Sequence, residues 1–202
     1  MNVPKQATPD QPIHELIARR WSPYSFADRP VSEDDLRSLF EAARWAASSY
    51  NEQPWSYLVA TKANPDSFAR LLSCLVEANQ AWATAAPVLA LGCTNLRFAR
   101  NEQPNAAAVH DLGLASANLT LEATARGLFV HQMIGILPDK ARELYRIPDG
   151  VQPTTGLAIG YAADPDSLPE KYRQRDLTPR NRKPIAAFVF GEMWGRASSL
   201  TS

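Results

Sequence analysis

Residues 105–126 are expected to form one long helix, and its composition limits the folds open to this chain. Gly127 follows at the position where a helix commonly ends. The apolar residues recur nearly all round this helix: Val109, Leu112, Leu114, Ala115, Ala117, Leu119, Leu121 and Ala123. Because a helix that is apolar on every side has to be covered on several sides, we expect it at the centre of the molecule. Such complete covering in a small domain suggests a partner subunit.

The composition supports one globular domain over residues 1–202 and excludes several classes of protein. Hydrophobic residues make up 45% of the chain, enough for a folded core. The 21 basic and 21 acidic residues cancel, so no overall field attracts nucleic acid or an anionic membrane. No stretch reaches the roughly 18 apolar residues of a membrane span, and residues 1–11 are polar, which together favour a cytoplasmic protein. Cys74 and Cys93 lie far apart and are expected to be buried and reduced.

Helices and strands are expected to alternate along the chain. The helices are expected at residues 12–19, from Glu33 after the N-cap Ser32, at 65–76, at 105–126 and at 138–145, and the strands at 57–61, 88–93, 128–130 and 155–161. The alternation alone predicts a three-layer α/β sandwich. Residues 162–202 are rich in proline and basic residues and end in an apolar stretch, so we expect an arm that docks on the partner subunit.

The common catalytic signatures are absent from the sequence. There is no G-x-S-x-G, no H-E-x-x-H, no G-x-x-x-x-G-K-[ST] and no G-x-G-x-x-G. The three histidines, His14, His110 and His131, fall on separate expected elements, so we expect them to be structural or exposed and expect no metal site.

Three separated clusters carry polar chemistry. Arg19-Arg20-Trp21-Ser22 could grip a phosphate, although paired arginines also commonly close a surface helix. Residues 48–55, with the sequence Ser-Ser-Tyr-Asn-Glu-Gln-Pro-Trp, are dense in uncharged donors and acceptors and could equally form a turn. Residues 180–184 form a basic patch that alone would be a solvated charge run.

Taken in order along the chain, these clusters resemble the nitroreductase family of flavin enzymes. The resemblance is carried by R-R-x-S, S-S-x-N-x-Q-P-W, Asn79-x-x-Trp82, the long helix, His131-Gln132-Met133-x-Gly135, Gly160-Tyr161 and Arg182-Lys183-Pro184. It implies an α+β fold built as a three-layer α-β-α sandwich, in an interlocked homodimer with FMN in two interface clefts. It also implies that NAD(P)H reduces the FMN, which then passes electrons to a nitroaromatic, a quinone or a similar small flat acceptor.

The resemblance also assigns site residues. It places Arg20 and Ser22 on FMN from one subunit, with Arg182 on the phosphate, and Ser48, Ser49, Asn51 and Gln53 on FMN from the other subunit. Asn79 is implied to bind the pyrimidine end, and Ile134 and Gly135 to pass the reactive nitrogen N5. The full expected cofactor set adds Arg19, Trp21, Tyr24 and Arg180, and the expected substrate set is Trp82, Phe129 and His131. No catalytic acid or base is required.

Two positions depart from the family pattern. Ala47 stands where the family usually has proline, which should cost only loop rigidity. Tyr24 stands where the family commonly has Arg or Lys beside flavin N1 and O2, and a phenol brings no positive charge at neutral pH. Unless another cation takes that place, the flavin potential should fall, and Tyr24→Arg should raise it.

Two other readings remain open from the sequence. One is an FMN-dependent dehydrogenase or oxidase that acts on an organic substrate. The other is a dimeric binding protein without flavin. The sequence does not distinguish NADH from NADPH, because no pocket for the 2′-phosphate can be placed.

Overall fold

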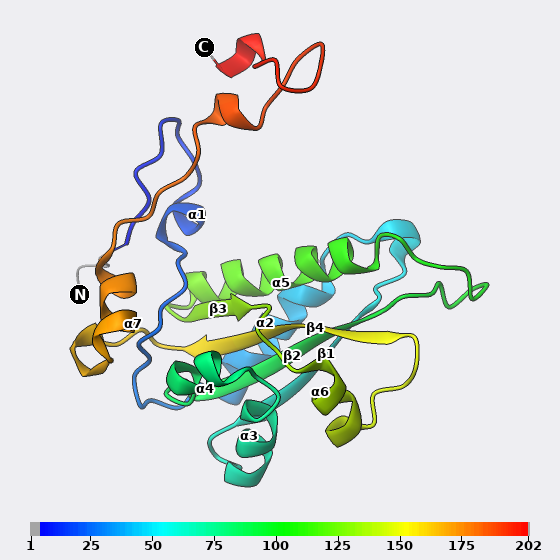
Figure 1. Cartoon of the computed structure of the whole chain (residues 1–202), viewed down its shortest axis with the longest axis vertical. Helices are drawn as coiled ribbons and strands as arrows, with labels where there is room; N and C mark the ends of the chain where they lie inside the picture. The colour runs from blue at the N-terminus through cyan, green and yellow to red at the C-terminus, as the bar shows by residue number, and fades with distance from the viewer. Residues whose placement is uncertain (1–4, 202) are drawn as a thin grey trace.

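The computed structural model describes residues 5–201, apart from the side chain of Ser167. Residues 1–4 of the polar N-terminal segment and residue 202 of the expected arm lie outside the described residues. Helices cover both faces of a single sheet (Figure 1). No helix within the described residues is both long and apolar enough to cross a bilayer.

The sheet has four strands in the order β1-β2-β4-β3, and each neighbouring pair is antiparallel. The strands are β1 (Trp55–Thr61), β2 (Val88–Asn95), β3 (Phe129–Met133) and β4 (Val151–Gly160). β1 and β3 are therefore the edge strands. The alternation of helix and strand suggests an α/β fold, but the antiparallel pairing makes the fold α+β, as the family resemblance implies.

The helices form two layers, which confirms the expected three-layer α-β-α sandwich (Figure 1). α2 (Glu33–Arg44) and α5 (Ala108–Ala125) cover one face of the sheet, and α3 (Pro65–Leu72), α4 (Glu77–Ala83) and α6 (Pro138–Tyr145) belong to the other side. The first layer buries Leu39 and Leu119 with Leu157 of β4, and the second buries Leu71 with Leu91 of β2. Cys74 and Cys93 are buried and free, as expected.

The remaining elements are short. α1 (Glu15–Arg19) and α7 (Glu170–Leu177) are helices, and single 3-10 turns lie at Ser49–Asn51, Pro165–Ser167, Ile185–Ala187 and Ser199–Thr201. α1 begins three residues later than predicted, because the side chain of His14 accepts the backbone N–H of Leu16 and so caps the helix there.

The helix predicted for residues 65–76 is two helices. α3 ends at Leu72. Leu75 instead forms a β-bridge with Ile136, and the N–H of Val76 donates to the carbonyl of Gly135 at 3.1 Å. The backbone of this segment is thus paired with the chain that follows β3, which no local pattern could indicate.

Within this chain α5 lies in an outer layer beside α2, not at the centre as predicted, and one stripe of it is uncovered. Val109, Gly113, Leu114 and Ala117 are all exposed, although they are apolar or lack a side chain. α5 begins three residues later than predicted and ends close to the predicted position, with Gly127 after it at a φ of +74°. The sheet and α2 cover one side of α5, as expected. The exposed stripe is not covered by other parts of the chain within residues 5–201.

The chain after α7 runs away from the sandwich beside the N-terminal segment (Figure 1). It carries large apolar side chains that are exposed: Phe188, Met193, Trp194 and Leu200. Trp194 is 92% exposed, which is unusual for tryptophan in a folded monomer.

Candidate functional site

Three arginines gather where the end of α1 meets the segment after α7. Burial lowers the pKa of Arg20 below its ordinary value, and the positive charges of Arg180 and Arg182 lower it further. Within residues 5–201, none of these three guanidiniums forms an ion pair with a carboxylate. Neighbouring positive charges without a counter-charge are suited to bind an anion such as phosphate.

Hydrogen bonds fix two of these arginines. Arg180 Nη1 donates to the carbonyl oxygens of Lys5 at 3.2 Å and Ala18 at 2.7 Å, which ties the arm to α1. Arg20 Nη1 donates to Ser22 Oγ at 3.3 Å. A guanidinium has five N–H groups, so both keep donors for a ligand. The structure thus brings together four of the predicted cofactor residues: Arg20, Ser22, Arg180 and Arg182.

Arg19 and Trp21 of the same motif are placed differently. Arg19 forms an ion pair with Glu15 on the surface of α1, at 3.2 Å. Trp21 is 4% exposed, and its ring packs edge to face on Phe129 with centroids 5.7 Å apart. Its buried indole N–H has no acceptor within residues 5–201. Contact of these residues with a cofactor or substrate stays a prediction.

Tyr24 lies at the centre of an aromatic cluster next to the arginines. Its ring centroid is 5.0 Å from that of Trp82, 4.7 Å from His131 and 5.4 Å from Tyr172. Trp82 is only 2% exposed, so it lies on the buried side of the cluster. The structure therefore joins Tyr24, Trp82 and His131, which the sequence placed in one cleft.

His131 is held as a neutral side chain. Its Nδ1 lies 2.9 Å from the carbonyl oxygen of Pro23. Burial lowers its pKa, and the positive charges of Arg175, Arg20 and Lys5 also lower it. The carbonyl contact assigns the proton to Nδ1, which leaves Nε2 as an acceptor.

The chain beyond β3 is fixed by α4. Asn79 Nδ2 donates to the carbonyl of Gly135 at 2.9 Å. A Cβ at position 135 would lie 2.4 Å from Asn79 Nδ2 and 2.9 Å from Val76 Cγ2, so only glycine fits. Ile134 beside it is 88% exposed. β3 is an edge strand, so this segment continues from an open edge of the sheet, and Trp21, the residue after Arg20, packs on Phe129 at the start of the same strand.

The polar loop of residues 48–53 is strained and fixed. Tyr50, Asn51 and Gln53 all have positive φ values, of 54°, 56° and 51°. The backbone N–H of Ser49 donates to Asp111 at 3.0 Å, and that of Gln53 donates to Ser48 Oγ at 3.0 Å. Non-glycine residues at positive φ cost energy and cluster at functional sites. The loop is therefore a second candidate part of a binding site.

The loop and the arginine cluster lie at opposite ends of α5. The loop is bonded to Asp111 in the first turn of α5, whereas Trp21 packs on Phe129, just after the last turn. The 18 residues of α5 span about 27 Å. Within one chain, Ser48, Ser49, Asn51 and Gln53 therefore do not join the other predicted cofactor residues.

Sequence reasoning missed three residues near the cluster. Lys5 Nζ lies 5.3 Å from the Trp21 ring centroid. Arg175 and Asp176 both contact Tyr24. The sequence does carry a signal for the helix that holds Arg175 and Asp176. It is a run of good helix formers after Pro169, in which Tyr172 and Asp176 lie one turn apart on one face.

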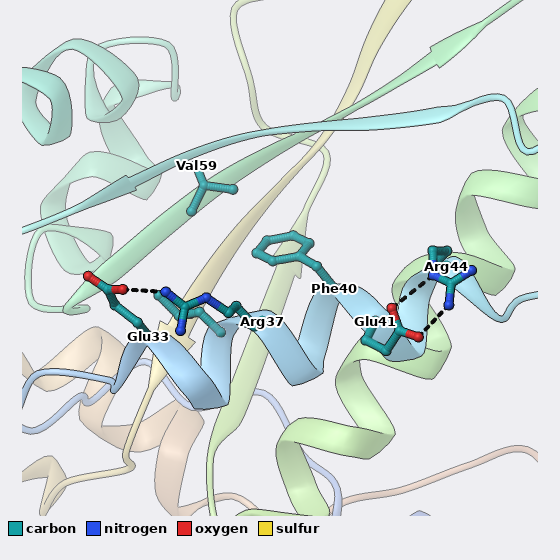
Figure 2. Close-up of a pocket in the computed structure, with 7 residues that line it drawn as sticks. Glu33, Arg37, Phe40, Glu41, Arg44 and Val59 are labelled. Atoms are coloured by element: carbon teal, nitrogen blue, oxygen red, sulfur yellow. Dashed lines mark hydrogen bonds and ion pairs between the residues drawn. The ribbon is translucent and has the colours of Figure 1, made fainter.

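A surface groove lies apart from this site, between α2 and the edge strand β1 (Figure 2). Phe40 and Val59 line it, and its charged side chains already pair with each other on α2, as in the 2.6 Å contact of Glu33 with Arg37. None of its lining residues belongs to the predicted site.

Comparisons with known proteins show the family of the chain. The family model described as "Nitroreductase family" matches residues 17–161. The chain is 28% identical over 188 residues to the FMN reductase [NAD(P)H] of Bacillus subtilis, covering 82% of this chain and 73% of that protein. It is 33% identical over 124 residues to an uncharacterized 15.4 kDa protein of Mycolicibacterium smegmatis, covering 61% and 82%.

Solved structures show the same fold. A structure described as an oxidoreductase containing FMN superposes with a TM-score of 0.87 at 32% identity, covering 95% of this chain and 96% of that one. A nitroreductase family protein of Clostridium difficile superposes with a TM-score of 0.68 at 23% identity, covering 88% and 96%.

Proposed function

The chain belongs to the nitroreductase family, and we propose that it is an FMN-dependent oxidoreductase that passes hydride from NAD(P)H to a nitroaromatic, a quinone or a similar flat acceptor. The observation that carries the proposal is the cluster of the partly buried Arg20 and Arg180 with the exposed Arg182, none of which has a carboxylate partner within residues 5–201. A phosphate group supplies the missing negative charge.

The residues along the open edge of β3 fit the rest of FMN. When bound, FMN supplies the redox chemistry by accepting hydride from NAD(P)H and passing the electrons to the acceptor. Ser22, bonded to Arg20, offers a hydroxyl beside the phosphate site. Gly135, held by Asn79, presents backbone without a side chain. Tyr24, His131 and the exposed Ile134 provide an apolar and aromatic wall for flat molecules.

The absorbance spectrum of the purified protein tests cofactor binding directly. Bound FMN gives a yellow protein that absorbs at about 450 nm. Arg182→Gln should lower FMN affinity, whereas Arg37→Gln on the exposed surface of α2 is the matched control and should not. Protein that stays colourless and takes up no FMN would instead be a binding protein of the same fold.

Anaerobic mixing with NADH and with NADPH tests the reaction. Loss of the flavin absorbance with either nucleotide supports the reductase, and subsequent recovery with a quinone or nitroaromatic supports the acceptor class. If neither nucleotide bleaches bound FMN, the dehydrogenase or oxidase acting on an organic substrate is favoured instead.

We further propose that two copies form an interlocked homodimer in which residues 162–202 dock on the partner. Two features support it: the exposed stripe of Val109, Gly113, Leu114 and Ala117 on α5, and the exposed side chains of the arm. A twofold pairing would also supply the loop at 48–53 from the second copy, which one chain cannot bring to its own arginine cluster.

Light scattering after size-exclusion chromatography tests the dimer. Ala117→Glu places a charge in the α5 stripe and should shift the protein towards monomer. Ala69→Glu places the same charge on the exposed face of α3 and is the matched control. A wild-type monomer, or a monomer produced equally by both variants, would contradict the proposed interface.

A further inference from the structure

Arg175 stands beside the proposed flavin site without a carboxylate partner. It lies in α7, a helix of the segment after the sandwich. Within residues 5–201 it forms no ion pair. Its neighbour Asp176 does not neutralise it by hydrogen bonding, because the carboxylate accepts the backbone N–H groups of Tyr24 and Ser25.

The guanidinium of Arg175 contacts a neutral phenol instead. Its Nη1 donates to Tyr24 Oη at 3.0 Å, and its Cζ lies 5.6 Å from the Tyr24 ring centroid. Because the phenol oxygen accepts this bond, the phenol's own proton is directed to another acceptor. A hydroxyl that accepts a bond from a cation is a stronger donor than an isolated one.

Tyr24 lies between the arginine cluster and β3. It is two residues beyond Ser22, which is bonded to Arg20, and its ring packs on His131 of β3. A molecule whose phosphate sits at the cluster and whose ring lies along β3 would pass Tyr24, whose hydroxyl is held by Arg175.

The field of Arg175 reaches the same edge. Its positive charge is one of those that lower the pKa of His131. A charge that disfavours a cation at this position favours an anion there.

We propose that Arg175, acting through the hydroxyl of Tyr24, supplies the positive charge that stabilises reduced FMN over oxidised FMN. The inference rests on the proposed function. It replaces the expectation that Tyr24 leaves the flavin without a cation. Arg175 is here a positioning and charge-supplying residue, since Tyr24 lies between it and the ring.

The midpoint potential of bound FMN, measured by anaerobic titration against reference dyes, tests the proposal. Arg175→Gln should weaken binding of reduced FMN relative to oxidised FMN by about threefold to tenfold. Since tenfold corresponds to about 30 mV for a two-electron couple, the potential should fall by about 15–30 mV. Arg175→Lys keeps the charge and should recover much of the loss.

Two further variants separate this role from a structural one. Tyr24→Phe should also lower the potential, and the double variant Tyr24→Phe with Arg175→Gln should fall no further than the larger single effect. Arg173→Gln removes the same charge from the same helix, but Arg173 is paired with Asp166 at 3.0 Å, so the potential should not change.

The outcomes distinguish the inference from the function on which it rests. If the wild type binds FMN and Arg175→Gln leaves the potential unchanged, the inference is wrong and the proposed function stands. An equal fall in Arg173→Gln would also overturn it, because any charge on α7 would then suffice. If the wild type binds no FMN, both proposals fail.

Discussion

Replacing Asp176 should separate α7 from the loop that carries Tyr24. The carboxylate is 1% exposed. Its Oδ1 accepts the Tyr24 N–H at 3.0 Å, and its Oδ2 accepts the Ser25 N–H at 2.9 Å and the Tyr24 N–H at 3.1 Å. One side chain thus satisfies two backbone donors from a segment about 150 residues away in sequence.

The expected loss of stability follows from those two donors. A buried N–H left without an acceptor costs about 1–3 kcal/mol. Asp176→Ala leaves two such groups but also removes a charge that is costly to bury, so we expect a net loss of about 2–4 kcal/mol. Asp176→Asn keeps one acceptor oxygen, and we expect it to lose less than Asp176→Ala.

The difference in stability between the wild type and Asp176→Asn should depend on pH. Burial raises the pKa of Asp176, and the two N–H groups and Lys5 only partly oppose it. The folded protein therefore holds the proton at a higher pH than the unfolded chain does. As the pH falls through the raised pKa towards the ordinary value, the wild type gains stability from this group, and Asp176→Asn does not. The stability advantage of the wild type should therefore grow as the pH falls.

Urea unfolding at a fixed protein concentration measures these differences. Asp166→Asn is the control, because Asp166 is an exposed partner of Arg173 and its loss should cost less than about 1 kcal/mol. If Asp176→Ala unfolds within about 0.5 kcal/mol of the wild type, the hydrogen bonds do not hold the segments together. An advantage over Asp176→Asn that shrinks at lower pH would refute the electrostatic reasoning.

Three further predictions follow from single contacts. Gly160→Ala would place a Cβ 2.5 Å from Pro87 Cδ, and because the proline ring is rigid, urea unfolding should show a loss of about 1–3 kcal/mol. Inorganic phosphate should raise the melting temperature of the protein without FMN, and should raise it less in Arg182→Gln; an equal rise in both would contradict an anion site at this arginine. The lowered pKa of His131 means that the unfolded chain takes up a proton on this histidine at a higher pH than the folded protein does. The melting temperature should therefore fall as the pH drops below about 6.5, and it should fall less in His131→Gln.

The sequence predicted the elements whose signals are local. Ser32 caps α2, with its Oγ accepting the Asp35 N–H at 3.0 Å, and α6 has the predicted bounds of residues 138–145. It failed where distant backbone decides the structure, as at Leu75, which pairs with Ile136 instead of extending α3. It also left α7 unassigned, because that helix is held by Asp176 and Tyr172 against residues far away in sequence.

For the site, the sequence supplied the residue types and the structure supplied the grouping. Arg20, Arg180 and Arg182 come from opposite ends of the chain, and their proximity depends on Arg180 binding the carbonyl oxygens near α1. The role of Tyr24 could not be judged from sequence, since its partner Arg175 is 151 residues away and carries no motif.

The length of α5 links cofactor binding to association. Each chain holds an arginine cluster near one end of α5, a helix about 27 Å long, and the polar loop with Asn51 near the other end. No small ligand bridges that distance, and both parts are already fixed by their own hydrogen bonds. A second copy paired across the exposed face of α5 in the opposite direction would bring each loop to the other chain's cluster, so that the same contact that covers Val109 and Ala117 also completes two binding sites.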